Sequence, residues 1–245
     1  MLRSSILALI ALAVMLGGAP AAGPPIPEQR EQVEQIIHDY LLKNPEFLIE
    51  VLKAADAKQK QQQEEHARAA LAAKRDELLN DPSSPVGGNP HGDVTIVEFF
   101  DYRCPYCKQV QPMLEALLKE DSKLRIVYKE FPILGSESVI ASRVALAALR
   151  QHTYEPFHDA MMAAKGQITE DVIMKVAADA GLDIAKVKTD MNAQEIDQII
   201  KRNYDLAHAL NIAGTPTFII GDTLIPGAVD LATLRRTIAE ARKSR

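Results

Sequence analysis

The residues best suited to chemistry are the two cysteines of the motif Cys104-Pro105-Tyr106-Cys107, and the 245-residue chain has no others. A strand-like run precedes the motif and a helix-like run follows it. A helix N-terminus carries unpaired N–H groups and a partial positive charge, which favour the thiolate form of a nearby cysteine. The spacing therefore predicts a redox-active pair. We expect Cys104, at the helix cap, to be the exposed attacking sulfur, and Cys107, one turn inside, to be the buried resolving sulfur.

Other uses of the cysteine pair have to be weighed against redox chemistry. A structural disulfide of such short span closes almost no loop, so it would stabilise the fold little. A closed zinc site normally has four Cys or His ligands, and none of the six histidines is close to the pair in sequence. Two soft thiolates do suit Cu(I), which leaves a copper site at Cys104 and Cys107 open as an alternative. No resident cofactor is expected.

The motif lies within a regular succession of expected strands and helices. In chain order we first expect a strand at 94–100, a helix from Pro105 to about Leu118 that Pro112 kinks, and a strand at 124–131. A helical stretch from 136 to about 210 follows, with breaks at Gly166 and at 181–183. The chain then forms a hairpin of strands at 217–220 and 223–225 and a helix capped by Asp230. The first run is rich in β-branched and aromatic residues, as is typical of a buried central strand. Gly221-Asp222 is a good hairpin signal. The order predicts an α/β fold.

This order of elements resembles the thioredoxin fold, and the helical insertion resembles its DsbA branch, over roughly residues 91–243. The run Gly214-Thr215-Pro216-Thr217 stands just before the hairpin, where the family carries a cis-proline opposite the two cysteines. The resemblance implies that Pro216 is cis. It also implies that Thr215 and Pro216 face the reactive sulfur and pair with the extended backbone of a client protein. An ordinary trans turn is the alternative.

Glu98 stands six residues before Cys104 and matches the buried acidic residue that the family keeps beneath the active site. A buried lone carboxylate must be paired or must raise its pKa, and a raised pKa would suit a group that exchanges protons with Cys107. Lys129, on the neighbouring expected strand, is the expected partner of Glu98 in such a relay. A salt bridge at the edge of a strand, without a catalytic role, is the alternative for Glu98.

Several other residues near the motif have simpler expected roles. Pro105 and Tyr106 lie between the two cysteines, where intervening residues tune thiolate stability and redox poise. His152 and His158 fall in the helical insertion, and we expect them to be capping or surface residues rather than ligands. The pair Met161-Met162 is expected to pack in the core or to form an adaptable groove for clients.

Residues 1–21 predict a signal peptide, with the basic Arg3, an apolar run at 6–16 and an Ala19-x-Ala21 cleavage pattern. We therefore expect export to a periplasm and cleavage of this peptide. That compartment is oxidising, and dedicated dithiol proteins make and reshuffle disulfides there. The formal net charge of -5 makes nucleic acid a poor candidate partner.

The segment 26–80 is expected to be helical and to precede the catalytic domain. A second helix should begin at Pro45, because Asn44 is a good cap and proline is tolerated in a first turn. The stretch 58–66 is polar on every side, so we expect a solvated rod or connector there. Residues 81–90 are rich in Pro, Gly and Ser and are expected to be a linker to the catalytic domain at 91–245. Apolar residues recur at helical spacing in the first half of the segment, at Val33, Ile36, Ile37, Tyr40, Leu41, Leu48, Val51 and Leu52.

The apolar face of residues 33–55 needs a partner. It could fold back onto the catalytic domain as a helical hairpin, or it could pack on further copies of the chain. We favour self-association, because the polar stretch 58–66 would keep the sticky helices apart from the catalytic domain.

A helical stalk followed by a DsbA-like domain with a Cys-Pro-Tyr-Cys motif resembles the suppressor of copper sensitivity protein C (ScsC-like) group. The resemblance implies a homotrimer formed through residues 26–80, disulfide isomerase activity on protein clients, a membrane partner that resets the cysteines, and a link to copper tolerance. Two rivals remain. One is a monomeric DsbA-type dithiol oxidase, and the other is a protein that sequesters Cu(I) with the dithiol and catalyses nothing.

Overall fold

The computed structural model describes residues 27–244, so the expected signal peptide at 1–21 lies outside the described residues. The chain divides into two compact units, of which the first ends at Gln59 and the second begins at Lys60. Within residues 27–244, no helix is both long and apolar enough to cross a membrane.

Two helices begin the described chain. Helix α1 spans Pro27–Lys43 and α2 spans Pro45–Ala73, so the second helix begins at the expected proline. The side chain of Asn44 donates a hydrogen bond to the carbonyl oxygen of Tyr40 (2.8 Å), which closes the end of α1. The ring of Tyr40 packs edge-on against Phe47 with centroids 5.9 Å apart, and this contact joins the two helices. The expected helical N-terminal segment is confirmed.

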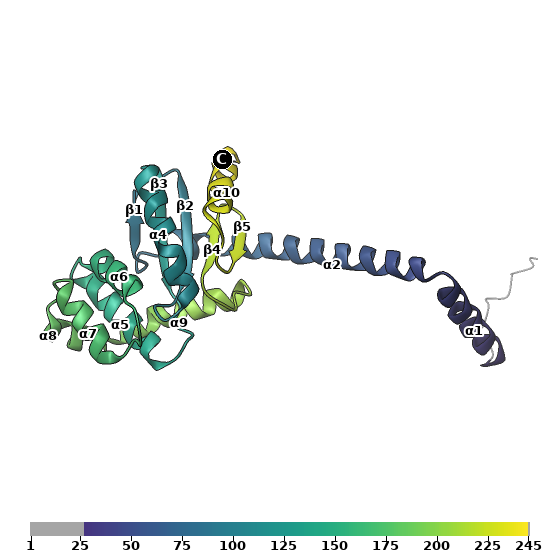
Figure 1. Ribbon diagram of the computed structural model, residues 1–245, viewed down its shortest axis with the longest axis horizontal. Helices are drawn as coiled ribbons and strands as arrows, with labels where there is room; N and C mark the ends of the chain where they lie inside the picture. The colour runs from purple at the N-terminus through teal and green to yellow at the C-terminus, as the bar shows by residue number, and fades with distance from the viewer. Residues whose placement is uncertain (1–26, 245) are drawn as a thin grey trace, which may run out of the picture. The chain divides into compact units, whose positions relative to one another are not determined.

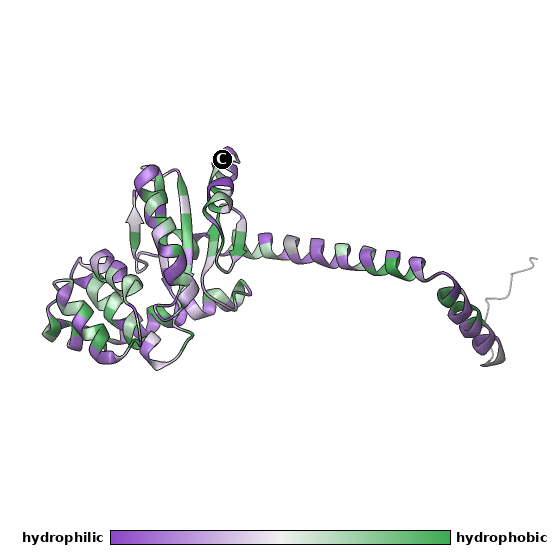
Figure 2. Ribbon diagram, in the orientation of Figure 1, coloured by the Kyte–Doolittle hydropathy of each residue, from purple (hydrophilic) through white to green (hydrophobic). Residues whose placement is uncertain are grey.

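The second unit is built around a five-stranded mixed sheet with the order β1-β3-β2-β4-β5 (Figure 1). Its strands are β1 (Val86–Gly88), β2 (Val94–Phe100), β3 (Leu124–Glu130), β4 (Thr217–Ile220) and β5 (Thr223–Pro226). The β2 and β3 strands are parallel, and the other neighbouring pairs are antiparallel. The β2 strand is central, and most of its residues are hydrophobic, which appears as green ribbon in Figure 2. The thioredoxin fold is confirmed.

Alternation along β2 sends successive side chains to two separate cores. Ile96 and Phe100 join the larger core, which is covered by α4 (Pro105–Glu120), α10 (Leu231–Lys243) and the helical insertion. Val97 and Phe99 join a smaller core on the opposite face, beneath α3 (Arg75–Leu79) and the C-terminal half of α9 (Gln194–Ala209). This alternation decides which titratable groups can meet at the active site.

The expected helical insertion consists of α5 (Ser136–Arg150), α6 (Tyr154–Ala163), α7 (Glu170–Asp179), α8 (Ile184–Asp190) and α9. Two of its breaks contain the expected glycines Gly166 and Gly181, which adopt the left-handed φ values of 82° and 87°. Thr169 and Asp183 cap α7 and α8 through their side-chain oxygens. The insertion is thus held by local signals in its own sequence. Helix α4 is continuous across Pro112.

The segment before the sheet differs from the expected free linker. Leu71 and Leu78 are buried in the smaller core, so the end of the expected stalk packs on the catalytic domain. The expected linker at 81–90 contains β1, which pairs with β3. The pair Gly87-Gly88 does not prevent this pairing, because β1 lies at the edge of the sheet and pairs with β3 on one side only.

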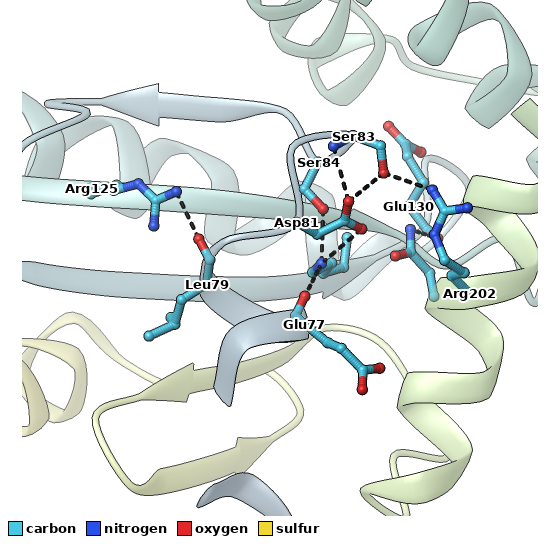
Figure 3. Close-up of polar contacts among 10 residues, drawn as sticks. Glu77, Leu79, Asp81, Ser83, Ser84, Arg125, Glu130 and Arg202 are labelled. Carbon is cyan, nitrogen blue, oxygen red and sulfur yellow. Dashed lines mark hydrogen bonds and ion pairs between the residues drawn. The ribbon is translucent and has the colours of Figure 1, made fainter. Parts of the chain in front are cut away.

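Polar contacts fasten residues 77–84, which we call the anchor segment, to the sheet (Figure 3). The buried ammonium of Lys129 donates to the carbonyl oxygen of Glu77 (2.7 Å) and to Ser84 Oγ (2.8 Å). It also lies 3.7 Å from an Asp81 carboxylate oxygen. Burial lowers the pKa of Lys129 to about 8, and the neighbouring Asp81 charge opposes that fall.

Two arginines extend this attachment. Arg125, on β3, donates to the carbonyl oxygen of Leu79 (2.8 Å), and Arg202, on α9, donates to Ser83 Oγ (2.9 Å). Cations from two elements of the catalytic domain thus bind one short segment. The anchor segment is therefore an integral part of that domain.

Replacing Lys129 with Met should destabilise the protein by about 2–4 kcal/mol, because Asp81 and the Glu77 carbonyl lose their buried donor. Urea unfolding of the full chain measures this loss. The exposed Lys123 next to β3 provides the matched control, and Lys123→Met should change stability by less than about 0.5 kcal/mol. Equal effects of the two substitutions would show that the anchor segment is not held by Lys129.

Candidate active site

The two cysteines lie where β2 gives way to α4. Cys104 is the N-cap residue of α4, with extended backbone dihedrals, and Pro105 follows in the first turn. Proline suits this position because the first N–H groups of a helix have no internal partner. The Cys104 amide donates to the Asp101 carbonyl oxygen (3.0 Å), which closes the turn between strand and helix. The local sequence thus places both sulfurs at the positive end of α4.

Both cysteines are free thiols, and both are covered by protein. Cys107 is fully buried and Cys104 is 3% exposed, so the expectation of an exposed Cys104 is wrong. The Sγ–H of Cys104 donates to the carbonyl oxygen of Thr215 (3.2 Å). The loop that faces the helix end therefore shields the sulfur. Tyr106, between the cysteines, is 60% exposed and borders the site on the solvent side.

The loop opposite the cysteines contains the cis peptide bond Thr215-Pro216, at the position that the family resemblance implies. Thr217 Oγ1 donates to the Gly214 carbonyl oxygen (2.8 Å), and the Gly227 amide donates to the Pro216 carbonyl oxygen (2.8 Å). These bonds tie the loop to the β4–β5 hairpin. The Thr215 carbonyl is thereby presented to Cys104.

Hydrogen-bond donors stabilise the Cys104 thiolate. The Cys107 S–H group is the main cause of a Cys104 pKa lowered to about 5, and burial opposes it. The Thr215 hydroxyl and the backbone N–H groups of Tyr106 and Cys107 lower the pKa further. Donors to the charged form favour ionisation, so Cys104 is poised as the nucleophile.

Cys107 has the opposite electrostatic environment. Burial raises its pKa far above that of an ordinary thiol, and its hydrogen bond to Cys104 and the charge of Glu98 add to the rise. Glu98 itself is fully buried, and burial together with the charge of Cys104 raises its pKa to about 8. Neither carboxyl oxygen of Glu98 has a hydrogen-bond partner among the described residues. A protonated Glu98 beneath a protonated Cys107 is therefore the resting arrangement.

The expectation that Lys129 pairs with Glu98 is wrong. Glu98 on β2 is in register with Tyr128 on β3, and Phe99 is in register with Lys129. Neighbours in register share a face of the sheet, so Lys129 points to the face opposite Glu98. Its ammonium binds the anchor segment instead.

A second buried carboxyl, Glu130, lies on the same face as Glu98 and was missed in the sequence. Its oxygens accept hydrogen bonds from the hydroxyls of Tyr102 (3.1 Å), Tyr154 (2.8 Å) and Ser142 (2.7 Å). Burial raises the Glu130 pKa to about 8, although these donors oppose the rise. A charged residue inside an apolar strand was the available signal. The negative charge of Glu130 contributes to the raised pKa of Glu98.

His158 lies in the interior and not at the surface, contrary to expectation. Its ring is fully buried among aromatic rings, including Phe100 (centroids 4.9 Å apart) and Tyr128 (4.5 Å). Nδ1 lies 3.2 Å from the Tyr102 hydroxyl. Burial lowers the His158 pKa to about 3, which keeps the ring neutral. His152 is exposed and adopts a left-handed φ of 56°, and Met161 and Met162 pack in the larger core.

A metal site of several ligands has no support in the described part of the chain. Between residues 27 and 244, no three His, Cys, Asp or Glu side chains gather in a way that could hold an ion.

Two models of known families match parts of the chain. The DSBA-like thioredoxin domain matches residues 95–239, and the copper resistance protein ScsC N-terminal domain matches residues 29–62. The two matches coincide with the redox domain and with the exposed N-terminal helices.

Solved structures show the same relationship. A thioredoxin-like oxidoreductase from Silicibacter pomeroyi is 44% identical with a TM-score of 0.68, over 70% of this chain and 99% of that one. ScsC of Proteus mirabilis in a transitional conformation is 29% identical with a TM-score of 0.68, over 90% of this chain and 100% of that one. Among curated relatives, the Na(+)/H(+) antiporter NhaA 3 of Salinispora tropica is 26% identical over 71% of this chain. The match spans 28% of that relative's own length.

Replacing Cys107 with Ala should raise the Cys104 pKa from about 5 by roughly one unit or more, because the thiolate loses its main donor. Titration of thiolate absorbance in the far ultraviolet, on the reduced full-length protein, measures the shift. Cys104→Ser should abolish the titration near pH 5 altogether. An unchanged midpoint in Cys107→Ala would exclude the Cys107 S–H group as the donor that lowers the pKa.

Proposed function

The chain belongs to the DSBA-like thioredoxin family, and from that premise we propose that it is a periplasmic protein disulfide isomerase or reductase that works as a self-associated assembly and contributes to copper tolerance. The chain is a thiol-disulfide oxidoreductase of the DsbA/ScsC type. The single observation that carries the finer proposal is the exposed apolar surface of the N-terminal helices. That surface accompanies a redox domain that already has a complete core of its own.

The apolar residues of α1 and of the first turns of α2 lie open to solvent. Their exposed fractions are between 44% and 70%, for Val33, Ile36, Ile37, Tyr40, Leu42, Phe47, Leu48, Ile49, Val51 and Leu52. The members of this set that recur at helical spacing form an exposed apolar face, which marks an interaction site because burying it against another chain removes it from water. Residues 29–62 match the ScsC N-terminal domain, and we take three copies as the assembly.

In the proposed reaction, the Cys104 thiolate attacks one sulfur of a client disulfide. A Cys104–client disulfide forms, the client S–S bond breaks, and the second client sulfur leaves as a thiolate. Isomerisation is complete when another client thiolate attacks the mixed disulfide, which releases Cys104 unchanged. Reduction is complete when Cys107 attacks the Cys104 sulfur, which releases the reduced client and leaves the Cys104–Cys107 disulfide. A membrane partner then resets the pair by returning two electrons.

We assign Glu98 the role of proton acceptor for Cys107 in the resolving step. Cys107 must lose its proton before it can attack, and its surroundings disfavour the free thiolate. In the mixed disulfide, Cys104 carries no negative charge and no longer raises the Glu98 pKa, so Glu98 can release its own proton and then accept the proton of Cys107. Thr215 and Pro216 shape the face where the client chain would lie.

A dithiol oxidase is the second candidate, favoured by the low pKa of Cys104. Stabilising the thiolate stabilises the reduced form, which makes the corresponding disulfide a stronger oxidant. The direction of the reaction then depends on which partner resets the pair. Cu(I) sequestration by the two sulfurs is the third candidate, and binding of the ion would release the proton of Cys107.

Replacing Glu98 with Gln should slow the resolving step and leave the first attack by Cys104 nearly unchanged. Decay of a Cys104–glutathione mixed disulfide in the two proteins measures the resolving step. Stability provides an independent check, since the folded state keeps the Glu98 proton between about pH 4.5 and 8 while the unfolded chain has released it. The free energy of unfolding of the wild type should therefore fall as pH rises through this window. That of Glu98→Gln should fall by a few kcal/mol less. Equal decay rates would remove Glu98 from the mechanism.

Placing a charge on the apolar face should dissociate the assembly and remove isomerase activity. Ile36→Lys introduces a lysine into the face, and Gln35→Lys introduces the same charge on the opposite side of α1, beside Asp39. Light scattering should give a trimer mass for wild type and Gln35→Lys and a smaller mass for Ile36→Lys. Reactivation of scrambled ribonuclease should fall only in Ile36→Lys, while oxidation of a reduced client should persist. A monomeric wild type, or full reactivation by a monomeric Ile36→Lys, would contradict the proposal.

A further inference from the structure

The turn that carries Cys104 is short and belongs to neither of its flanking elements. Residues 101–104, the redox turn, connect the end of β2 to the start of α4. Its backbone hydrogen bonds are few, from the Cys104 amide to the Asp101 carbonyl oxygen (3.0 Å) and from the Lys108 amide to the Cys104 carbonyl oxygen (3.2 Å), so further contacts must hold it. Residues 134–138, which we call the α5 entry, make those contacts.

The Asp101 carboxylate makes the first set of contacts. Asp101 is fully buried, and its Oδ1 accepts hydrogen bonds from the Arg103 amide (2.7 Å) and from Ser138 Oγ (2.8 Å). Its Oδ2 accepts a hydrogen bond from the Leu134 amide (3.0 Å). The Asp101 carbonyl oxygen accepts from the Cys104 amide (3.0 Å). One residue therefore bonds to the redox turn and to the α5 entry at once.

Arg103 makes the second set of contacts, in which its side chain donates the hydrogen bonds. Its Nη1 donates to the Leu134 carbonyl oxygen (2.6 Å) and to Glu137 Oε2 (2.9 Å). Both backbone polar groups of Leu134 are thus bound by the redox turn, the N–H by Asp101 and the C=O by Arg103.

Gly135 shows how closely the two segments fit. It adopts a φ of 115°, and a Cβ added there would lie 2.9 Å from Arg103 Nη1. Only glycine leaves room for the guanidinium and tolerates this backbone conformation. The close approach therefore depends on Gly135 in the α5 entry as well as on Arg103 in the redox turn.

We propose that Asp101 and Arg103 are positioning residues for Cys104, which fasten the redox turn to the α5 entry and so hold the Cys104 sulfur in line with its hydrogen-bond donors. Those donors come from α4 and from the Thr215 loop. Hydrogen bonds weaken steeply when their angles open, so a small shift of the redox turn would misalign several at once. The inference rests on Cys104 being the attacking sulfur of the proposed function.

A simpler alternative is that Arg103 acts only as a cation near the thiolate. Both accounts expect Arg103→Met to raise the Cys104 pKa, but they differ for Glu137→Gln. Freeing Arg103 from Glu137 would lower the Cys104 pKa if charge alone mattered, because more of the positive charge would be available. If the contact positions the turn, the same substitution loosens it and raises the Cys104 pKa.

The experiment titrates the thiolate absorbance of reduced full-length variants, with stability measured in parallel by urea unfolding. We expect Arg103→Met to raise the Cys104 pKa by about one unit, which is a tenfold loss of thiolate at a pH below the midpoint. Glu137→Gln, Ser138→Ala and Gly135→Ala should raise it by smaller amounts. Arg143→Met provides the matched control, since Arg143 pairs with Asp197 from another turn of α5 and should leave the Cys104 pKa unchanged.

A lower pKa in Glu137→Gln, or unchanged values in both Ser138→Ala and Gly135→Ala, would overturn the proposal. A fall in stability without a pKa shift would also overturn it, because that is the result of a purely structural contact. The titration uses no client protein. The result of the titration therefore does not depend on isomerase activity, which the ribonuclease assay tests separately.

Discussion

The active site depends on one hydrogen bond, from the Cys107 S–H group to the Cys104 thiolate. This bond makes two sulfurs that are three positions apart chemically different, with one ionised near pH 5 and the other holding its proton. Its geometry requires both residues in the first turn of one helix, where backbone N–H groups add to the stabilisation. The rest of the domain holds that turn in place and shields it from water.

The sheet keeps its buried charges on separate faces. Glu98 and Glu130 lie on the face that supports α4, where neither forms a salt bridge with any residue between 27 and 244 and both pKa values rise to about 8. Lys129 lies on the other face, where it binds residues 77–84. A lysine beside Glu98 would hold the carboxylate ionised and end its ability to accept a proton near neutral pH. Attachment of the N-terminal segment and proton exchange therefore use opposite sides of the same strands.

Much of the architecture could be predicted from local patterns. The break at Asn44-Pro45, the glycines of the insertion and the Gly221-Asp222 hairpin each act within a few residues, and the structure confirms the elements that they predict. The Thr215-Pro216 position could be recognised because its motif stands directly before a strand. Such signals need no knowledge of which elements are neighbours in space.

The errors concern contacts between distant segments. Pairing Glu98 with Lys129 failed because it requires the register of β2 on β3, and a shift of one residue moves a side chain to the opposite face. The aromatic enclosure of His158 and the burial of Leu78 depend on tertiary packing that composition does not reveal. The polar, glycine-containing residues 81–90 gave no sign of β1, because an edge strand of three residues needs no apolar pattern.

The central claim is that the fold creates one reactive and one protected thiol. Alkylation of the reduced, full-length protein with iodoacetamide at about pH 6.5, followed by peptide mass spectrometry, tests it most directly, since this pH lies above the Cys104 pKa and below that of an ordinary thiol. The account predicts rapid modification of Cys104 and none of Cys107 until the protein is unfolded. Modification of both cysteines at similar rates in the folded protein would contradict it.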